Sequence, residues 1–502
     1  MDSFIQRIID SITSETHLIS VVNNPDGFLS RPDTQEKILK ESGLLLLPIE
    51  SSIELRVRFE LSDKNSGNKV CYIYDDVESI LPDIMMHIYV APTFKISKLL
   101  PACNEIVLLK AKNLTFNIAS YIYKKKFTNT LTAQETIKLL EETDSIYGTD
   151  EETLKKELTR IPLKWEKVET IEKISYLLLS AIKNNLYDNI VSVLETINED
   201  FQKFIDSKYA SMINSSAIQR PKMVHKILPN ILHQHSRTDK VALVVIDGMS
   251  YWQYLLLKRE LSFLEIGTDD NQILSWIPSI TKLSRQAIFR GESPVIEYNQ
   301  SPKSESSLWI DFWTSSKQKA AKRLQTYEVG YIHGSLCLDN MQYRRIALVD
   351  TDLDEKMHSS SSNKELYLLT ENWAHDTAKD IKELHENGYH IYITTDHGNV
   401  YTSPWRNLTS QEKTFLFEKE SRGKRHLIYS KKEYLDRFIS SNNDIENQLL
   451  STEKWTNNSA VWRNLYSFNN NECITHGGSH FLEVVIPVSY THLRAHETGR
   501  NL

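Results

Sequence analysis

The sequence predicts an α/β fold in its second half, with a mostly parallel sheet and helices on both faces. Short apolar runs of strand length, rich in Val and Ile, recur after residue 236 as VALVVID, RRIALVDTD, YHIYITTD and FLEVVIPV. Segments with helical periodicity lie between them, such as ENWAHDTAKDIKELHENG. Strands that are apolar on both sides and alternate with helices are typical of a parallel sheet covered by helices on both faces.

The first half of the chain predicts two further regions. Residues 1–110 contain the strand-like runs IELRVRFEL and KVCYIYDD between turn-rich joins, which predicts a small α/β domain. Residues 111–235 place apolar residues at spacings of three and four, the pattern of amphipathic helices. We expect this helical region to act as a spacer or docking layer. A chain of 502 residues exceeds what one core usually supports, which favours several domains.

The main domain is expected over residues 236–488. Within it, residues 400–470 are polar and aromatic, with the basic run ESRGKRH, and predict an insertion or lid between two core strands. The strand FLEVVIPV is expected to end the domain, before a tail rich in His and Arg. Because residues 489–502 resemble translated vector sequence, we predict a non-native tail and exclude His492 and His496 from the site.

The composition limits the classes of protein. The 59 basic and 66 acidic residues give a net charge of −7, so a global basic field for nucleic acid is absent, although a local basic patch is compatible with this charge. Four cysteines without a CxxC spacing argue against a disulfide framework or a thiolate zinc site, and fit a cytoplasmic protein. No apolar stretch approaches the roughly 20 residues that span a bilayer, and the start MDSFIQRIIDSITSE lacks the features of a signal peptide.

Carboxylates follow the predicted strands. Asp247 comes directly after VALVVI, Asp396 follows YHIYITT, and further acids follow RRIALV. In parallel sheets, ligands bind beyond the carboxyl ends of the strands, so these side chains are expected at one edge. A single Asp-Gly pair is more often a turn than a site. It is the recurrence at several strand ends that indicates a binding site.

One carboxylate has a histidine at helical spacing. Asp354 and His358 are four residues apart, so a helical turn brings them to one face, where they could hold a divalent cation. A surface Asp–His pair is the alternative. Asp350 and Asp352 are rival ligands in the same run, but they lack this spacing to His358.

Two more histidines lie next to predicted strands. His397 follows Asp396 in ITTDHGNV, and His476 precedes two glycines and the last strand in ITHGGSHFLEVVIPV; His480 competes with His476 but lies closer to the strand. Each motif alone also fits a turn or loop. Together, three Asp and three His supply enough oxygen and nitrogen ligands for two ions such as Zn²⁺ or Mn²⁺. Two such ions can clamp the attacking and leaving oxygens of a phosphoryl displacement.

A candidate nucleophile lies in SWIPSITKLSRQAIFRG. Pro278 keeps the preceding residue extended, and Ser279 or Thr281 then begins an amphipathic helix. Either hydroxyl fits a helix cap or a nucleophile. Arg285 lies one turn after Thr281 on the same face, and it is our candidate for binding the equatorial phosphoryl oxygens; an ordinary surface arginine is the alternative.

The order of these motifs resembles a known family. Asp-Gly after the first strand, PSxT at the start of a helix, DxxxH, DHG, and HGG before the last strand are similar to the alkaline phosphatase superfamily. Within it, VVIDGMSYWQ, IPSITKLSRQAIFRG and THGGSHFLEVVIPV resemble the PglZ domain of bacterial phage-exclusion (BREX) systems, over roughly residues 236–488. The resemblance implies an alkaline-phosphatase-like core.

The resemblance also implies a site and a function. One metal would be held by Asp247, Thr281, Asp396 and His397. The other would be held by Asp354, His358 and His476. Thr281 would be the nucleophile of a metal-dependent phosphatase, phosphodiesterase or nuclease in phage defence, with a DNA methyltransferase and a large ATPase as partners. The alternatives are a non-catalytic scaffold and a phosphomutase-like isomerase, which needs a basic cluster for a small phosphorylated substrate.

Overall fold

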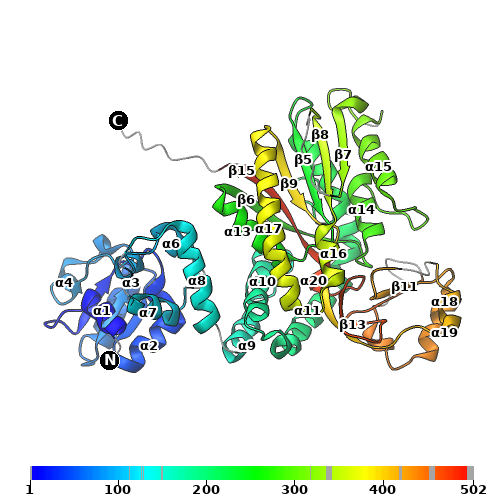
Figure 1. Ribbon diagram of the computed structural model, residues 1–502. Helices are drawn as coiled ribbons and strands as arrows, with labels where there is room; N and C mark the ends of the chain where they lie inside the picture. The colour runs from blue at the N-terminus through cyan, green and yellow to red at the C-terminus, as the bar shows by residue number, and fades with distance from the viewer. Residues whose placement is uncertain are drawn as a thin grey trace. The chain divides into compact units, whose positions relative to one another are not determined.

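The computed structural model divides the chain into two compact units, Met1–Thr149 and Asp150–Leu502 (Figure 1). It describes residues 3–111, 114–125, 127, 129–147, 151–316, 318–334, 342–417, 421–450 and 458–493. Each unit has its own main sheet and its own hydrophobic clusters. No helix in these ranges is long and apolar enough to cross a membrane.

The first unit is a small α/β fold around a parallel sheet. Its strands are β1 (Ile19–Val22), β2 (Leu45–Pro48), β3 (Val70–Ile73) and β4 (Tyr89–Val90), in the order β2-β3-β1-β4. Its helices are α1 (Ser3–Ile12), α2 (Pro32–Ser42), α3 (Ser52–Arg58), α4 (Pro82–Met85), α5 (Ile96–Leu99), α6 (Glu105–Lys110), α7 (Phe116–Lys125) and α8 (Ala133–Tyr147). Along β3, Cys71 and Tyr72 enter different clusters, so both faces of the sheet are covered. The small α/β fold expected at the start of the chain is confirmed.

One run predicted as a strand is helical. IELRVRFEL forms α3 and continues into a π-helical turn, Phe59–Asp63. Of its alternating apolar residues, Leu55 and Phe59 are buried, whereas Ile53 and Leu61 are 75% and 81% exposed. The strand prediction is wrong here because a spacing of four buries one helical stripe, and the remaining apolar residues lie on the solvent side.

The helices after residue 150 belong to the second unit. They are α9 (Glu151–Thr159), α10 (Val168–Lys183), α11 (Tyr187–Ile213) and α12 (Ile227–Gln234). α10 packs against α13 (Tyr251–Phe263) and α17 (Asn363–Glu386), and the buried residues of α10 and α11 join the main cluster of the second unit. The helical region expected over 111–235 is therefore divided between the two units, because its long apolar stripes cover the second unit's core.

A six-stranded sheet forms the centre of the second unit. Its strands are β5 (Val241–Ile246), β6 (Ile266–Leu274), β7 (Val329–His333), β8 (Arg345–Asp350), β9 (His390–Thr394) and β15 (Val485–Leu493), in the order β6-β15-β9-β5-β8-β7. β5 pairs in parallel with β8 and β9, and β7 pairs in parallel with β8. β15 is antiparallel to β6 and β9. The prediction of a mostly parallel sheet is confirmed.

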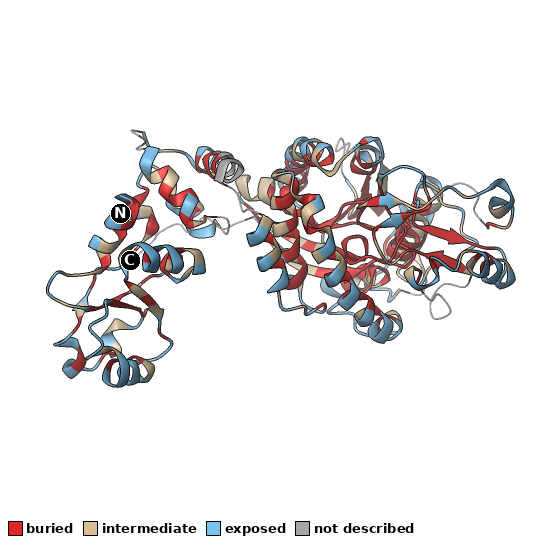
Figure 2. Cartoon of the chain, turned by 90° about the horizontal axis from the view of Figure 1, so that it is seen from below, coloured by how far each residue is buried: buried red, intermediate tan, exposed pale blue. Residues whose placement is uncertain are grey.

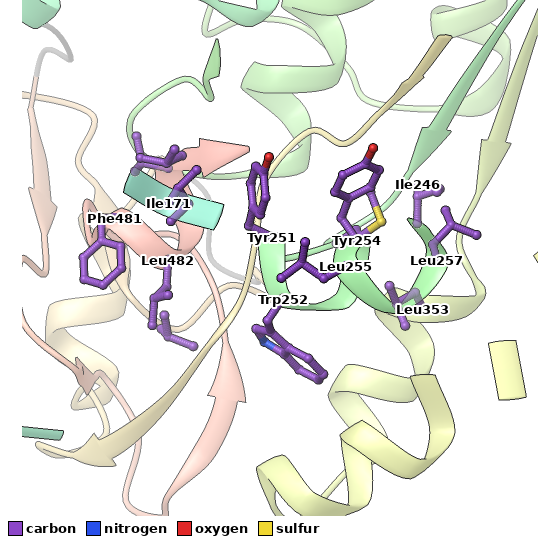
Figure 3. Packing of buried hydrophobic residues seen from close by; sticks show 14 of the residues in the cluster. Ile171, Ile246, Tyr251, Trp252, Tyr254, Leu255, Leu257, Leu353, Phe481 and Leu482 are labelled. Atoms are coloured by element: carbon purple, nitrogen blue, oxygen red, sulfur yellow. The ribbon is translucent and has the colours of Figure 1, made fainter. Parts of the chain in front are cut away.

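Helices cover both faces of this sheet. All of β5 is buried, and its successive side chains point to opposite sides. Ile246 belongs to the cluster with α10, α13 and α17, and Figure 3 shows it beside Leu257 and Leu353. Val245 belongs to the cluster with α12, α14 (Thr281–Arg290) and α15 (Pro302–Thr314). Figure 2 shows buried strands and helices whose inner faces are buried while their outer faces are exposed. The predicted helices on both faces are confirmed.

The segment between β9 and β15 folds into small sheets. β10 (Val400–Pro404), β13 (Tyr466–Ser467) and β14 (Cys473–Thr475) form one, and β11 (His426–Ile428) and β12 (Ser459–Val461) form another. The segment also holds α18 (Ser410–Thr414) and α19 (Lys432–Ser441). Trp405 packs against Phe438 and Trp462 in a separate hydrophobic cluster. Residues 400–470 of this segment are called the insertion below.

β15 runs beyond Val488, the residue at which we expect the strand to end. It pairs with β6 as far as Leu493, opposite Ile266, and Thr491 within this extension is buried. The predicted strand end is wrong, because the polar residues of SYTHL alternate along an ordered strand. That residues 489–502 are non-native stays a prediction.

The two histidines excluded from the site lie in or beyond this extension. His492 is on β15, 3.7 Å from the Asp269 carboxylate. His496 lies outside the described residues.

Candidate metal centre

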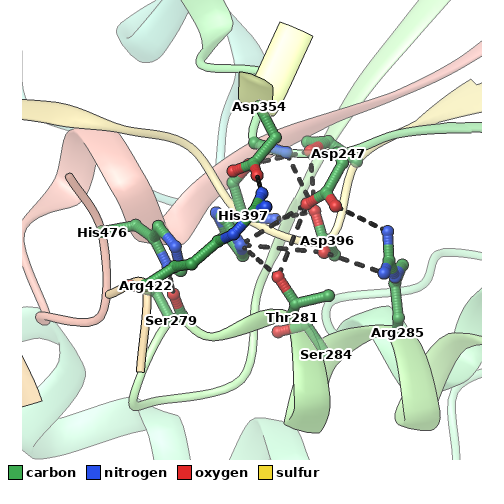
Figure 4. A network of polar contacts seen from close by, with 12 residues as sticks. Asp247, Ser279, Thr281, Ser284, Arg285, Asp354, Asp396, His397, Arg422 and His476 are labelled. Carbon is green, nitrogen blue, oxygen red and sulfur yellow. Dashed lines mark hydrogen bonds and ion pairs between the residues drawn. The ribbon is translucent and has the colours of Figure 1, made fainter. Parts of the chain in front are cut away.

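The topology of the sheet brings the candidate residues to one edge. Asp247 follows β5, Asp396 follows β9, and Asp354 lies in α16 (Asp352–Ser359) directly after β8. β9, β5 and β8 are parallel neighbours, so their carboxyl ends coincide. Because β15 is antiparallel, the loop that precedes it, with His476, lies at the same edge. Figure 4 shows the three carboxylates and His476 converging above the start of α14.

These residues form two groups with metal-ligand geometry. The buried group contains Asp247, Asp396 and His397, and its ligand atoms lie within 4.8 Å of one another. All three side chains are buried, and His397 Nε2 is 3.7 Å from Asp396 Oδ2 and 3.8 Å from Asp247 Oδ1.

The open group contains Asp354, His358 and His476, again with ligand atoms within 4.8 Å of one another. His358 is exposed in this group, whereas the other two residues are buried. The six carboxylates and imidazoles singled out in the sequence therefore all lie in one of the two groups.

The hydroxyl of Thr281 lies at the buried group. Thr281 is the first residue of α14, and its Oγ1 is 3.0 Å from His397 Nε2 and 3.5 Å from Asp247 Oδ1. The rival hydroxyl of Ser279 is buried elsewhere. Ser279 Oγ donates to Glu483 Oε2 at 2.9 Å and accepts from Gly477 N at 3.0 Å. Of the two hydroxyls, only that of Thr281 contacts the groups.

Two histidines are held in a defined tautomer. His397 Nδ1 is 3.0 Å from the carbonyl oxygen of Gly398, and His476 Nδ1 is 3.0 Å from that of Ser279. Because a carbonyl oxygen only accepts, each Nδ1 carries a proton, and in a neutral imidazole Nε2 is then the nitrogen with the lone pair. Burial lowers the pKa of His476 well below its usual value, and the neighbouring His397 adds to this, so His476 is neutral. A hydrogen bond from Nδ1 to a backbone carbonyl oxygen is typical of metal-ligating histidines.

The rival acids have other partners. Asp350 Oδ1 accepts from Asp352 N at 2.9 Å, and Asp350 Oδ2 accepts from Trp373 Nε1 at 2.8 Å. Asp352 is exposed and pairs with Lys356 at 2.6 Å. Asp354 is the acid of this run that reaches His358, at 3.4 Å. The rival His480 caps α20 (Phe481–Val484) and belongs to neither group.

The burial of these acids leaves lone pairs without partners. Asp354 Oδ1 and Asp396 Oδ2 are buried and have no hydrogen-bond partner among the described residues. Burial raises the pKa of Asp247 well above its usual value, and the nearby Asp396 and Asp354 carboxylates add to this, whereas Arg285 opposes it. Burial acts in the same direction on Asp354, but the interactions with His358, His476 and His397 together outweigh it and lower the pKa of Asp354. Crowded carboxylates of which two oxygens lack hydrogen bonds fit a cation.

Arg285 is engaged by protein carboxylates. It is 5% exposed; its Nη1 donates to Asp247 Oδ2 at 2.7 Å and its Nε to Glu305 Oε1 at 2.9 Å. Its Nε is also 3.9 Å from Asp396 Oδ2. These contacts join Arg285 to protein carboxylates, and that Arg285 binds the phosphoryl oxygens stays a prediction.

Glu305 is a residue that sequence reasoning missed. It is fully buried and also accepts hydrogen bonds from Tyr331 Oη and Gln300 Nε2. Its burial could have been predicted from the sequence spacing, since Glu305, Trp309 and Trp313 repeat every four residues on the buried face of α15.

Glu483 is a second residue that the sequence did not reveal. It is fully buried and accepts from Arg425 Nε at 3.0 Å, Ser279 Oγ at 2.9 Å and Gly478 N at 2.9 Å. One carboxylate thereby joins the loop before α14, the two-glycine loop after His476 and the insertion. The sequence feature that could have indicated a buried, paired Glu483 is its position as the single acid inside the apolar run FLEVV.

A third group of possible ligands lies at the opposite edge of the sheet. His235, Asp239 and His390 offer atoms within 4.8 Å of one another, next to the starts of β5 and β9. The two oxygens of Asp239 accept from Ser236 N and Ser236 Oγ, at 2.9 and 2.6 Å. His235 Nε2 faces Tyr392 Oη at 2.8 Å. These local hydrogen bonds explain why the three residues lie together, in a polar turn, without a metal ion.

A family model identifies the domain that carries the two groups. Residues 225–491, just over half of the chain, match the BREX system PglZ alkaline phosphatase-like domain. The chain belongs to the PglZ family. The resemblance expected from the sequence and the alkaline phosphatase-like fold are confirmed, and the family connects the PglZ domain with BREX phage exclusion.

Solved structures of similar fold include two enzymes from other sources. Murine ectonucleotide pyrophosphatase/phosphodiesterase 5 is 12% identical over 51% of this chain and 88% of its own, with a TM-score of 0.36. Phosphonoacetate hydrolase from Sinorhizobium meliloti 1021, in complex with phosphonoformate, is 12% identical over 53% of this chain and 92% of its own, with a TM-score of 0.32. No curated protein matches the sequence. The similarity concerns the fold alone.

Proposed function

We propose that the PglZ domain is a metal-dependent phosphoryl hydrolase, of phosphatase or phosphodiesterase type, that acts in phage defence in the cytoplasm. The observation that carries the proposal is the position of Thr281. Its hydroxyl, at the first turn of α14, is 3.0 Å from Nε2 of His397 and lies near carboxylates of which two oxygens have no hydrogen-bond partner among the described residues.

The two groups fit two divalent ions. Thr281 and the buried group would hold one, and the open group would hold the other. Oxygen and imidazole ligands without a thiolate suit Zn²⁺ or Mn²⁺. When bound, the ions would lower the pKa of the Thr281 hydroxyl and offset the charge of the phosphoryl oxygens.

The residues of the chain then have separate tasks. The N-terminus of α14 favours the Thr281 alkoxide, because the helix presents unpaired N–H groups and a positive dipole end there. The hydroxyl proton leaves to solvent, Oγ1 attacks phosphorus, and the bond from phosphorus to the leaving oxygen breaks. Water then attacks the phosphorus of the phosphothreonine, the bond from phosphorus to Thr281 Oγ1 breaks, and the phosphate product leaves as the hydroxyl regains a proton. Arg285 keeps Asp247 oriented throughout by a 2.7 Å hydrogen bond.

Hydrolysis assays on purified protein test the proposal. Metal content is measured first, and then turnover of p-nitrophenyl phosphate, a monoester, and bis-p-nitrophenyl phosphate, a diester, with Zn²⁺ or Mn²⁺. We expect ion-dependent hydrolysis of at least one of them. A protein that binds two ions and hydrolyses neither ester would favour the scaffold function.

We also propose that the first unit docks the other proteins of the system, a DNA methyltransferase and a large ATPase. An exposed apolar stripe supports this. Ile53, Val57 and Leu61 recur every four residues and are 75%, 49% and 81% exposed, and such patches are typical of protein interfaces. The double variant Ile53→Ser/Leu61→Ser should lose binding to the purified partners. Ile106→Ser, at a residue 62% exposed elsewhere in this unit, is the control.

A further inference from the structure

A hollow lies beside the open group. It has a volume of about 910 Å³ and is lined by Glu355, His358, Ser359, Lys413, Ser421, Arg422 and Lys424. Small-ligand pockets typically measure about 300–1,000 Å³, so this hollow accommodates much more than one phosphate ion. It shares His358 with the open group, and therefore continues directly from the candidate metal centre.

The wall of the hollow that the insertion supplies is basic. Lys413, Arg422 and Lys424 come from the insertion, and all three are exposed, while Glu355 on α16 is the acidic residue of the lining. Lys424 Nζ donates to the carbonyl oxygen of Ser421, another residue of the lining, at 2.8 Å. Among the residues of the lining that the structure describes, three cations and one carboxylate give a local positive field in a chain of net charge −7.

Arg422 links the hollow to the centre. Its Nη1 donates to Asp354 Oδ2 at 3.0 Å, as the dashed line in Figure 4 shows, yet 69% of its side chain is exposed. The guanidinium therefore has N–H donors directed to solvent as well as to the open group. A guanidinium in this position matches the geometry of a phosphate oxygen pair.

We propose that this hollow binds a second phosphate of the substrate, beyond the phosphoryl group attacked by Thr281. The inference rests on the proposed hydrolase function and names its substrate class: compounds with at least two phosphates. A monoester has no group to occupy a cationic hollow of this size, because its one phosphate lies at the metal centre. Lys413 and Lys424 bind the second phosphate, and Arg422 lies between the two positions.

Binding measurements test the inference without requiring turnover. The metal-loaded full chain is titrated calorimetrically, at fixed ionic strength, with inorganic phosphate, with tripolyphosphate and with a single-stranded oligodeoxynucleotide. We expect at least one of the two larger probes to bind about tenfold tighter than phosphate, because charge-assisted hydrogen bonds contribute on this scale. Tighter tripolyphosphate binding indicates contiguous phosphates, and tighter oligonucleotide binding indicates a nucleic-acid backbone.

The double variant Lys413→Ala/Lys424→Ala should lose about that tenfold preference and leave phosphate binding unchanged. The matched control is Lys431→Ala/Arg437→Ala, which removes the same charge from exposed positions of the insertion that do not line the hollow. Equal affinities for all three probes, or the same loss in the control, would overturn the inference. A wild type that binds tripolyphosphate tightly but hydrolyses no ester would refute the hydrolase and leave the phosphate site standing.

Discussion

The buried group and the open group consist of the same two residue types, but the residues that hold them in place come from different parts of the chain. Each contains aspartate and histidine, and a buried arginine–glutamate pair lies behind each. Arg285 on α14 and Glu305 on α15 support the buried group, and both helices pack against the main sheet. Glu483 and Arg425 support the open group, and Arg425 comes from the insertion. One half of the centre thus depends on the core of the fold, and the other half depends on an added segment.

This difference assigns separate tasks to the halves. The hydroxyl of Thr281 contacts the buried group, so under the proposed function bond formation would belong to the part of the site that the core fixes. The open group contacts Arg422 and borders the basic hollow, so the proposed selection of substrate would belong to the part that the insertion builds. A change in the insertion should therefore alter selectivity without removing the nucleophile.

The largest effect is expected from Thr281→Ala. The substitution removes the attacking oxygen, so phosphoester hydrolysis should fall by about 10³-fold or more. The melting temperature should stay close to that of the wild type, because Thr281 is only partly buried. Steady-state kinetics with p-nitrophenyl phosphate and bis-p-nitrophenyl phosphate measure the loss.

Thr281→Ser is the matched control, since it keeps a hydroxyl at the same position. It should retain most of the hydrolysis that the alanine variant loses. Hydrolysis by Thr281→Ala at the wild-type rate would show that the buried group does not hold the nucleophile.

The central sheet was predictable because burial on both faces leaves uninterrupted apolar runs, and Asp247 and Asp396 are visible as the acids that end them. The α3 region was not predictable in the same way. Its alternating pattern resembles a strand, and only tertiary packing determines that Leu55 and Phe59 are the buried pair.

The candidate ligands could be proposed from the sequence, whereas the residues that support them could not. Motif order and spacing place the ligands, whereas Arg285, Glu305 and Glu483 take their roles from partners distant in the sequence. The basic hollow depends in addition on how the insertion approaches α16, which local sequence does not encode.

The next largest effect is expected from Glu483→Gln. Removing one partner of a buried ion pair leaves the other charge uncompensated, so the free energy of unfolding should fall by about 3 kcal/mol. Urea denaturation measures this change. Glu433→Gln, at an exposed position of α19, is the control and should have little effect. The open group should weaken first, because Glu483 holds Ser279, whose carbonyl oxygen fixes His476. An unchanged unfolding free energy would contradict a supporting role.

For each site, removal of the ion should have a somewhat smaller effect than Glu483→Gln. A ligand at a hundredfold excess over its Kd stabilises the native state by about 2.7 kcal/mol per site, so chelation should lower the melting temperature by several degrees. Differential scanning fluorimetry with and without chelator measures this shift. A melting curve that is identical in both conditions would count against the centre.

Single-ligand variants separate the two ions. Asp396→Asn should abolish ion binding at the buried group, and Asp354→Asn should abolish it at the open group. Elemental analysis of each variant should therefore show one bound ion in place of two. Asp352→Asn is the control, because Asp352 lies on the same helix as Asp354 but pairs with Lys356 at the surface. Loss of both ions in either variant would mean that the two groups do not bind independently.

The smallest effect is expected from Arg285→Lys, and it distinguishes two roles of this arginine. If Arg285 positions Asp247, the variant should bind the ion of the buried group about tenfold more weakly, because second-shell partners tune metal affinity on this scale and lysine cannot bridge Asp247 and Glu305 with a planar fork. At saturating metal, the affinity for inorganic phosphate should then be unchanged. If instead Arg285 contacts the phosphoryl group, as its helical spacing from Thr281 suggests, phosphate affinity should fall and metal affinity should not.

Arg422→Lys provides the comparison from the open group, since Arg422 contacts Asp354 from an exposed position and its loss should affect anion binding more than metal binding. Metal titration followed by phosphate titration of both variants gives the two affinities, and we expect the positioning result for Arg285 because its guanidinium is 5% exposed and already bonded to two carboxylates.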